Sequence, residues 1–202
     1  MNKILRNMAF SAILLTSSLY AELGFSSLKG LISTANLTPI IGLEAGQSNI
    51  DYKIIESGLA TYEDTAELNH IGLKLGTETT HYRIFLSSRI FDSDQFDYAR
   101  TYGMELQYLF NLSNRVNMFI GVNAGTIDME FEDDRNTNTI TLDNTYYGGD
   151  IGFNLHLSDG IDFELGARIM SLNSSESEDV ARYDFDNIIT SYASIILKFP
   201  SN

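Results

Sequence analysis

The chain has 202 residues, a formal net charge of −14 and no cysteine. Its length suits a single all-β domain. The lack of cysteine excludes disulfides, thiolate metal sites and a lipid-modified cysteine. A surface this acidic repels phosphate groups, so nucleic acid is excluded as a partner. No segment after the N-terminus approaches the ~20 apolar residues of a membrane-spanning helix.

The N-terminus has the layout of a secretory signal, which indicates export. Lys3 and Arg6 precede an apolar stretch from residue 8 to about residue 15, and small residues then lead to Ala21. We therefore predict a cleaved signal peptide over residues 1–21. Residues 22–38 are expected to be a periplasmic segment that could form a short amphipathic helix, and residues 39–200 are expected to be the main domain.

From residue 39 onward, apolar and polar residues alternate with a period of two, the pattern of β-strands. In the clearest stretch, Met104, Leu106 and Tyr108 fall on one face and Gly103 and Glu105 on the other. Eight such stretches occur, an even number with lengths near ten residues, as in small membrane barrels. In chain order they are 39–52, 67–76, 81–90, 98–110, 116–130, 147–157, 161–169 and 187–199.

The connections between these stretches alternate in length, as they do in transmembrane barrels. Short turns are expected near residues 76–80, 111–115 and 158–160. Long polar loops are expected near residues 53–66, 90–97, 131–144 and 171–186. The pattern predicts an all-β, eight-stranded, antiparallel, up-and-down transmembrane β-barrel, with both termini and the short turns in the periplasm and the long loops outside.

Two features favour a membrane barrel over a soluble β-sandwich, which also alternates. The polar faces are rich in glycine and carry isolated charges, which suits the packed interior of a narrow barrel. Aromatic residues also gather near the strand ends and are expected to form two interfacial girdles. One girdle would hold Tyr52, Tyr98, Tyr102 and Tyr147, and the other Tyr82, Tyr108, Phe110 and Phe199.

With its signal peptide, eight alternating strands, alternating loop lengths and a last strand ending at Phe199, the chain resembles the small eight-stranded outer-membrane barrels. The membrane domain of outer membrane protein A belongs to that group. The resemblance covers about residues 39–199 and implies a place in the bacterial outer membrane, among its lipids and lipopolysaccharide. It also implies that the barrel assembly machinery recognises the final aromatic strand.

Charged residues on the polar faces are expected to point into the barrel. If the turn near 158–160 is tight, Asp150 faces Arg168 and His156 faces Asp162. Buried charges need partners, so these residues are predicted to form a salt-bridge network that fills the lumen. The predicted members are Glu44, Lys74, Arg83, Glu105, Asp150, His156, Asp162, Glu164, Arg168 and Lys198.

Three functions are compatible with this pattern. We favour a structural or surface-interaction barrel with a filled lumen, and the alternative is a narrow channel for small solutes or ions whose charge pairs exchange to open it. A lipid-modifying enzyme is less favoured. His156, Ser158 and Glu164 offer a base, a nucleophile and an acid, and their spacing is similar to the His-x-Ser of an outer-membrane lipid A deacylase. The expected turn, however, places Ser158 away from lipid.

The predicted loops are strongly acidic and could contact an extracellular ligand. Clusters near residues 92–97, 130–134 and 176–186 could also hold Ca²⁺ or Mg²⁺, but none has the spacing of an EF-hand, and a solvated acidic surface is the preferred interpretation. His70 and His81 show no metal-ligand spacing. No enzyme activity, cofactor or metal is therefore expected.

Overall fold

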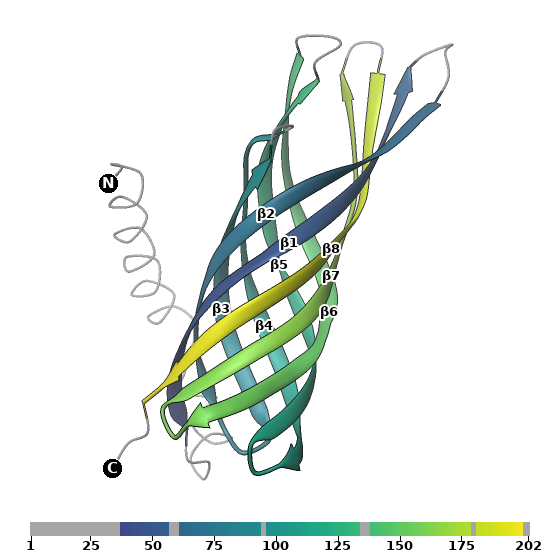
Figure 1. Cartoon of the computed structure of the whole chain (residues 1–202). Helices are drawn as coiled ribbons and strands as arrows, with labels where there is room; N and C mark the ends of the chain where they lie inside the picture. The colour runs from purple at the N-terminus through teal and green to yellow at the C-terminus, as the bar shows by residue number, and fades with distance from the viewer. Residues whose placement is uncertain (1–36, 57–60, 94–95, 134–137, 179–180, 200–202) are drawn as a thin grey trace, which may run out of the picture. The chain divides into compact units, whose positions relative to one another are not determined.

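The computed structural model describes residues 37–56, 61–93, 96–133, 138–178 and 181–199. They form one closed antiparallel barrel in which each strand pairs with the next and β8 pairs with β1 (Figure 1). This confirms the predicted eight-stranded architecture. The predicted signal peptide and nearly all of the segment 22–38 lie outside the described residues. The strands are β1 (Thr38–Glu56), β2 (Thr61–Glu78), β3 (Tyr82–Ser93), β4 (Phe96–Ser113), β5 (Val116–Asp133), β6 (Asn138–Ser158), β7 (Ile161–Glu178) and β8 (Ala181–Lys198).

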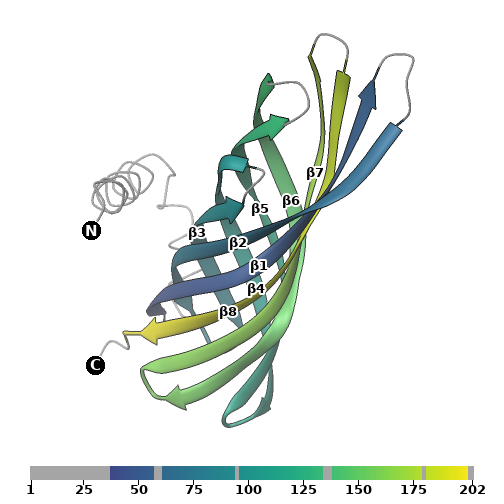
Figure 2. The ribbon, with the colours of Figure 1, turned by 45° about the horizontal axis from the view of Figure 1, so that its top comes forward.

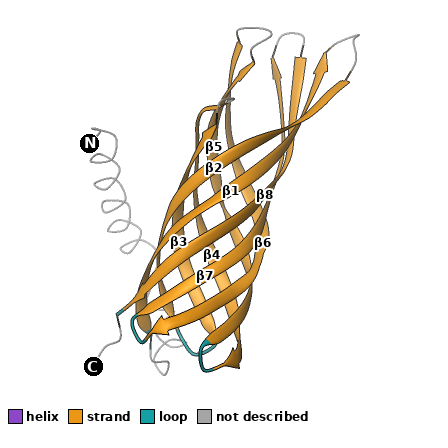
Figure 3. Ribbon diagram, in the orientation of Figure 1, coloured by secondary structure: helices purple, strands orange, loops and turns teal. Residues whose placement is uncertain are grey.

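Three tight turns close one end of the barrel, which we call the turn end. They join β2 to β3, β4 to β5 and β6 to β7, and are the short loops in Figure 3. Their positions confirm the predicted short connections. The last strand also finishes at the turn end, where the Phe199 backbone N–H donates to the carbonyl of Pro39 at 2.9 Å.

The prediction of long loops at the other end was wrong, because most of these residues continue the strands. β1 and β2, for example, remain paired out to Ile55 and Thr61. The strands are 12 to 21 residues long, well beyond the ten or so that cross a bilayer. The strands continue because residues such as Ile54 and Tyr62 favour extended backbone, even where the outside of the wall is polar.

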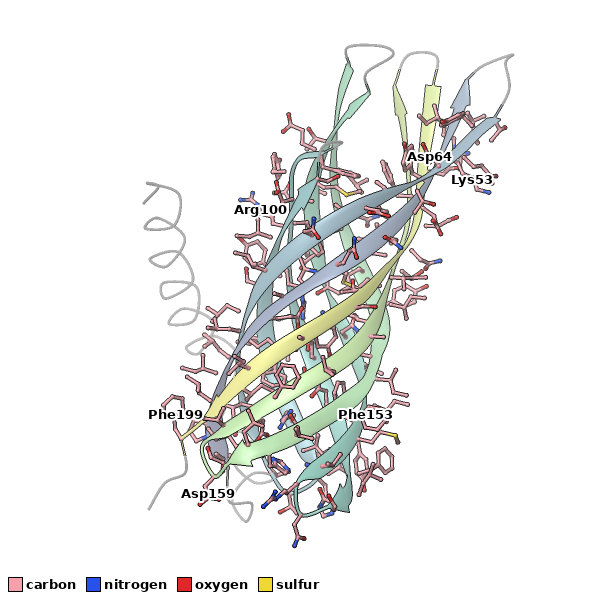
Figure 4. All side chains as sticks on the ribbon, viewed as in Figure 1. Lys53, Asp64, Arg100, Phe153, Asp159 and Phe199 are labelled. Carbon is pink, nitrogen blue, oxygen red and sulfur yellow. The ribbon has the colours of Figure 1, made fainter. Side chains whose placement is uncertain are left out.

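The wall near the turn end is apolar on its outside. Large apolar side chains there are 36% to 63% exposed, and Phe153 and Phe199 project outward from the strands (Figure 4). Among the described residues, no helix is long and apolar enough to cross a membrane. The outward apolar residues of the central strands are Met104, Leu106, Ile120, Val122, Ile151, Phe153, Leu165 and Ile195.

Away from the turn end, the apolar face of each strand changes from the outside of the wall to the inside. We call the half of the barrel near the turn end the lower part, and the half beyond this change the outer part. On β1, Leu43 is exposed and Glu44 buried, whereas a few residues later Ile50 is buried and its neighbours Asn49 and Asp51 are exposed. Tyr52 lies inside this outer part of the barrel and is 6% exposed, so its prediction as an interfacial residue was wrong. With polar side chains on the outside, apolar residues gain most by turning inward.

The inward apolar residues of the outer part form one core. It is continuous across all eight strands, and we call it the outer core. Its members are Ile50, Tyr52, Ile54, Ala66, Leu68, Phe91, Phe96, Ala99, Ile127, Met129, Leu142, Tyr146, Met170, Leu172, Phe185 and Ile188.

Two seams divide the wall around this core. β6 and β7 are paired only as far as Tyr147 and Ser171, and β2 and β3 only as far as Asn69 and Asp92. Beyond those points, β7, β8, β1 and β2 form one sheet, which rises away from the β5–β6 hairpin in Figure 2. The outer part is therefore two facing sheets with an apolar interior, built on a closed barrel.

Candidate functional site

All ten side chains predicted to face the lumen do so. Most are nearly inaccessible to solvent; Lys74, Arg83, Asp162 and Glu164 are fully buried at 0% exposure. His156 and Lys198, near the turn end, retain side-chain exposures of 25% and 11%. The residues come from β1, β2, β3, β4, β6, β7 and β8, so their contacts cross the lumen and tie distant parts of the wall together.

Glu44 of β1 is the centre of the network. Its Oε1 accepts from Arg89 Nε at 2.6 Å, from Arg168 Nη1 at 2.9 Å and lies 3.0 Å from His70 Nε2. Its Oε2 lies 2.7 Å from Lys74 Nζ. Arg89 and Arg168 also bind Glu105 on the opposite side of the barrel. One carboxylate of β1 thus meets three cations from three different strands.

A second cluster lies nearer the turn end. Arg83 donates to Glu164 at 3.1 Å and to Asp162 at 2.9 Å, and Lys198 lies 2.7 Å from both Asp162 and Glu78. Because buried ions cost several kcal/mol each when unpaired, two-sided pairing of this kind is needed for the charges to be tolerated in the lumen.

Lys74 joins the two clusters. Its ammonium group lies 2.9 Å from Glu164 and 2.7 Å from Glu44. The centroid of the Tyr192 ring lies 4.5 Å from Lys74 Nζ and 4.4 Å from the guanidinium carbon of Arg168. Such cation–π contacts add stabilisation where water is excluded. The network is continuous along the lower lumen.

Three members of the network were missed in the sequence: His70, Glu78 and Arg89. The alternation that places Arg83 inward also places Arg89 inward, six residues later on β3, so the signal for Arg89 was present. The turn expected near residues 76–80 includes Glu78, whereas Glu78 ends β2 and its carboxylate lies 2.5 Å from the Arg83 guanidinium. His70 shares the inward phase of Lys74 and was considered only as a metal ligand.

Asp150 lies opposite Arg168, as expected from the tight turn, but forms no ion pair with it. The guanidinium of Arg168 instead binds two carboxylates, those of Glu44 and Glu105. Asp150 instead accepts a hydrogen bond from Gln107 Nε2 at 2.8 Å. His156 does meet its expected partner, with Nδ1 2.8 Å from Asp162 Oδ1.

The catalytic-looking triplet does not assemble. His156 is bound to Asp162, both oxygens of Glu164 are occupied by Lys74 and Arg83, and Ser158 ends β6 at the tight turn. Among the residues that the structure describes, no group of three or more histidine, aspartate or glutamate side chains is arranged to hold a metal ion.

This combination of a polar lumen and an apolar outer belt agrees with a comparison of the sequence with protein families. The model for the outer membrane protein beta-barrel domain matches residues 18–193. The chain belongs to this family. It is an outer-membrane β-barrel of the Gram-negative bacterial type.

Solved structures show the same fold. The crystal structure of Neisserial surface protein A is similar over 79% of this chain and 97% of its own, with 12% identity and a TM-score of 0.55. The outer membrane protein OprG of Pseudomonas aeruginosa is similar over 83% of this chain and 99% of its own, with 13% identity and a TM-score of 0.51. No curated protein matches the sequence.

Proposed function

We propose that this outer-membrane barrel is a non-conducting structural element of the envelope that presents its outer part at the cell surface. The proposal is supported by buried side chains at two levels inside the barrel. The charge network occupies the lower lumen and the outer core occupies the lumen above it. An eight-stranded barrel has room for little more than its own side chains.

The outer part supports the surface role. Its exposed wall carries acidic side chains such as Asp51, Glu63, Asp64 and Glu67, with Lys53 bound to Glu63 at 2.8 Å (Figure 4). An acidic, strand-built projection suits a cationic extracellular partner. A role as an enzyme gains no support, since the groups of the one candidate triplet are already engaged by other partners.

Planar-bilayer recording of the purified barrel tests the filled lumen. We expect no stepwise conductance above the leak of the bare bilayer. The informative variant is Glu44→Ala, which removes the centre of the network, and Glu67→Ala on the outside of β2 is its matched control. Stepwise conductance of the unmodified barrel that is lost in Glu44→Ala, but kept in Glu67→Ala, would establish the narrow channel in place of our proposal.

A further inference from the structure

The lumenal face of β4, β5 and β6 contains a polar cluster that adjoins the charge network at Glu105. Register places Glu105, Asn123 and Gly148 on one rung, with Gly103, Gly125 and Tyr146 on the rung above and Gln107, Gly121 and Asp150 on the rung below. Asn123 is thus at the centre, and three of its four nearest inward positions are glycine.

Glycine lets neighbouring side chains lie close against the wall on both sides of Asn123. A Cβ added at Gly121 would lie 2.5 Å from Asp150 Oδ1, and one added at Gly125 would lie 2.8 Å from the Tyr146 hydroxyl. Asp150 and Tyr146, both on β6, therefore reach across β5 on the rungs below and above Asn123, and their oxygens occupy the space that side chains at these two glycine positions would fill.

Several polar atoms of this cluster have no hydrogen-bond partner in the protein. Asn123 is 4% exposed, yet neither its Oδ1 nor its Nδ2 has a hydrogen-bond partner. Asp150 Oδ1, Gln107 Oε1 and the Tyr146 hydroxyl are also buried without one. Buried polar groups are almost always bonded to protein, water or an ion, so several oxygens here, aligned on adjacent rungs, need a ligand.

The charge of the lumen points to the nature of that ligand. Among the described residues of the lower lumen, every inward carboxylate except Asp150 has a cation within 4 Å. The described lower lumen holds the five cations Lys74, Arg83, Arg89, Arg168 and Lys198, against the six carboxylates Glu44, Glu78, Glu105, Asp150, Asp162 and Glu164. Leaving aside the imidazoles of His70 and His156, the carboxylates outnumber these cations by one, and Asp150 is the carboxylate without an ion pair.

We propose that Asp150 and Asn123, with Gln107, bind one small monovalent metal cation such as Na⁺ in the lumen. Carboxylate and amide oxygens are the ligands that hard cations prefer. A single positive charge balances the remaining carboxylate, whereas a divalent ion would leave an excess charge of the opposite sign in a buried site. Water alone would satisfy Asn123 but would leave the charge of Asp150 unbalanced. Since the ligands come from three strands, no spacing along the sequence could reveal them.

The test compares unfolding of the detergent-folded full barrel in sodium chloride, potassium chloride and choline chloride at one pH and one ionic strength. The slower migration of the unfolded form on a gel reports the folded fraction. Binding of an ion to the folded state alone lowers the unfolding equilibrium constant about tenfold at ten times the dissociation constant. We therefore expect a higher unfolding midpoint in sodium or potassium than in choline, saturating with concentration.

Two variants locate the effect. Asp150→Asn removes the charge and should abolish the difference between salts, and Asn123→Ala keeps the charge and should weaken it several-fold. Asp186→Asn, an exposed carboxylate on β8, is the control and should retain the full difference. If Asp150→Asn does not fold, Asn123→Ala still decides the question.

Three outcomes would overturn the proposal. Equal midpoints in all three salts would mean that water alone fills the cluster. Midpoints that follow pH in choline, with no response to sodium or potassium, would mean that a proton balances Asp150. A salt difference that survives unchanged in both lumenal variants would place the ion elsewhere.

Discussion

The lower and outer parts of this barrel are built from the same strands but have opposite faces buried. In the lower part, Leu43 faces outward and Glu44 faces the lumen; in the outer part, Asn49 faces outward and Ile50 faces the lumen. Side chains alternate strictly along a strand, so the backbone does not change between the two parts. What changes is the surroundings of the wall: lipid requires an apolar exterior, and water allows an apolar interior.

The two interiors are consequently stabilised in different ways. The lower lumen depends on ion pairs, whose net contribution is small when intact because desolvation offsets their attraction. The outer core depends on apolar burial, which stabilises in proportion to the area removed from water. Removing one partner of an ion pair in the lower lumen should therefore cost more free energy than the intact pair contributes to stability.

The largest effect is expected from Glu44→Ala. The change leaves Arg89, Arg168 and Lys74 with one shared carboxylate fewer in a fully buried site, and breaking a buried pair of this kind costs about 3–5 kcal/mol. Urea unfolding of the barrel in detergent, followed by far-ultraviolet circular dichroism, gives the free energy of unfolding. The exposed variant Glu67→Ala should change it by less than about 0.5 kcal/mol. If Glu44→Ala lowered the free energy of unfolding by less than about 1 kcal/mol, the three cations would not depend on Glu44 as their shared partner.

A smaller effect is expected from Ile50→Ala in the outer core. Ile50 is fully buried, and truncation of a buried isoleucine to alanine costs about 2–5 kcal/mol, a range that begins below that of a broken buried ion pair. The same unfolding measurement applies. Its control is the adjacent Asn49→Ala, which changes only the exposed face and should be nearly neutral. If Asn49→Ala were the more destabilising of the two, the inversion of faces on β1 would be wrong.

Most of the fold could be predicted from the sequence, because the signal lay in the alternation itself. The three tight turns and the inward phase of Glu44, Lys74 and Arg168 all follow from a period of two. The length of the strands did not follow, since residues 49–54 alternate with the apolar phase reversed and residues 61–65 are all exposed. One continuous apolar face along each strand therefore predicts strands that are too short, and it places Tyr52 on the wrong side of the wall.

The partners within the site could not be predicted either, for a different reason. Register determines that Asp150 lies opposite Arg168, but the side chain of Arg168 is long enough to reach across the lumen. It meets Glu44, which is 124 residues away in the sequence, because β7 and β1 are separated only by β8. Pairing across a closed barrel depends on its diameter and on competition among carboxylates, and neither appears in the alternation of one strand.

Single cysteine substitutions at exposed positions should leave the stability of the barrel nearly unchanged and report which positions are accessible to a reagent. The chain has no cysteine, so single substitutions can be labelled specifically with a maleimide too large to cross the outer membrane. Asn49→Cys, exposed on the outer part, should be labelled in intact cells. Asp159→Cys, in the tight turn between β6 and β7, should be labelled only after the outer membrane is permeabilised (Figure 4).

Leu43→Cys completes this series, since it shares the outward phase of Asn49 but faces lipid, where thiolate formation and reagent access are both poor. It should remain unlabelled in intact and permeabilised cells and react only after detergent solubilisation. Labelling of Asp159→Cys in intact cells would reverse the orientation of the barrel. Equal labelling of Leu43→Cys and Asn49→Cys would instead mean that the boundary between lipid and water does not lie between these two residues, and the change of interior along β1 would need another cause.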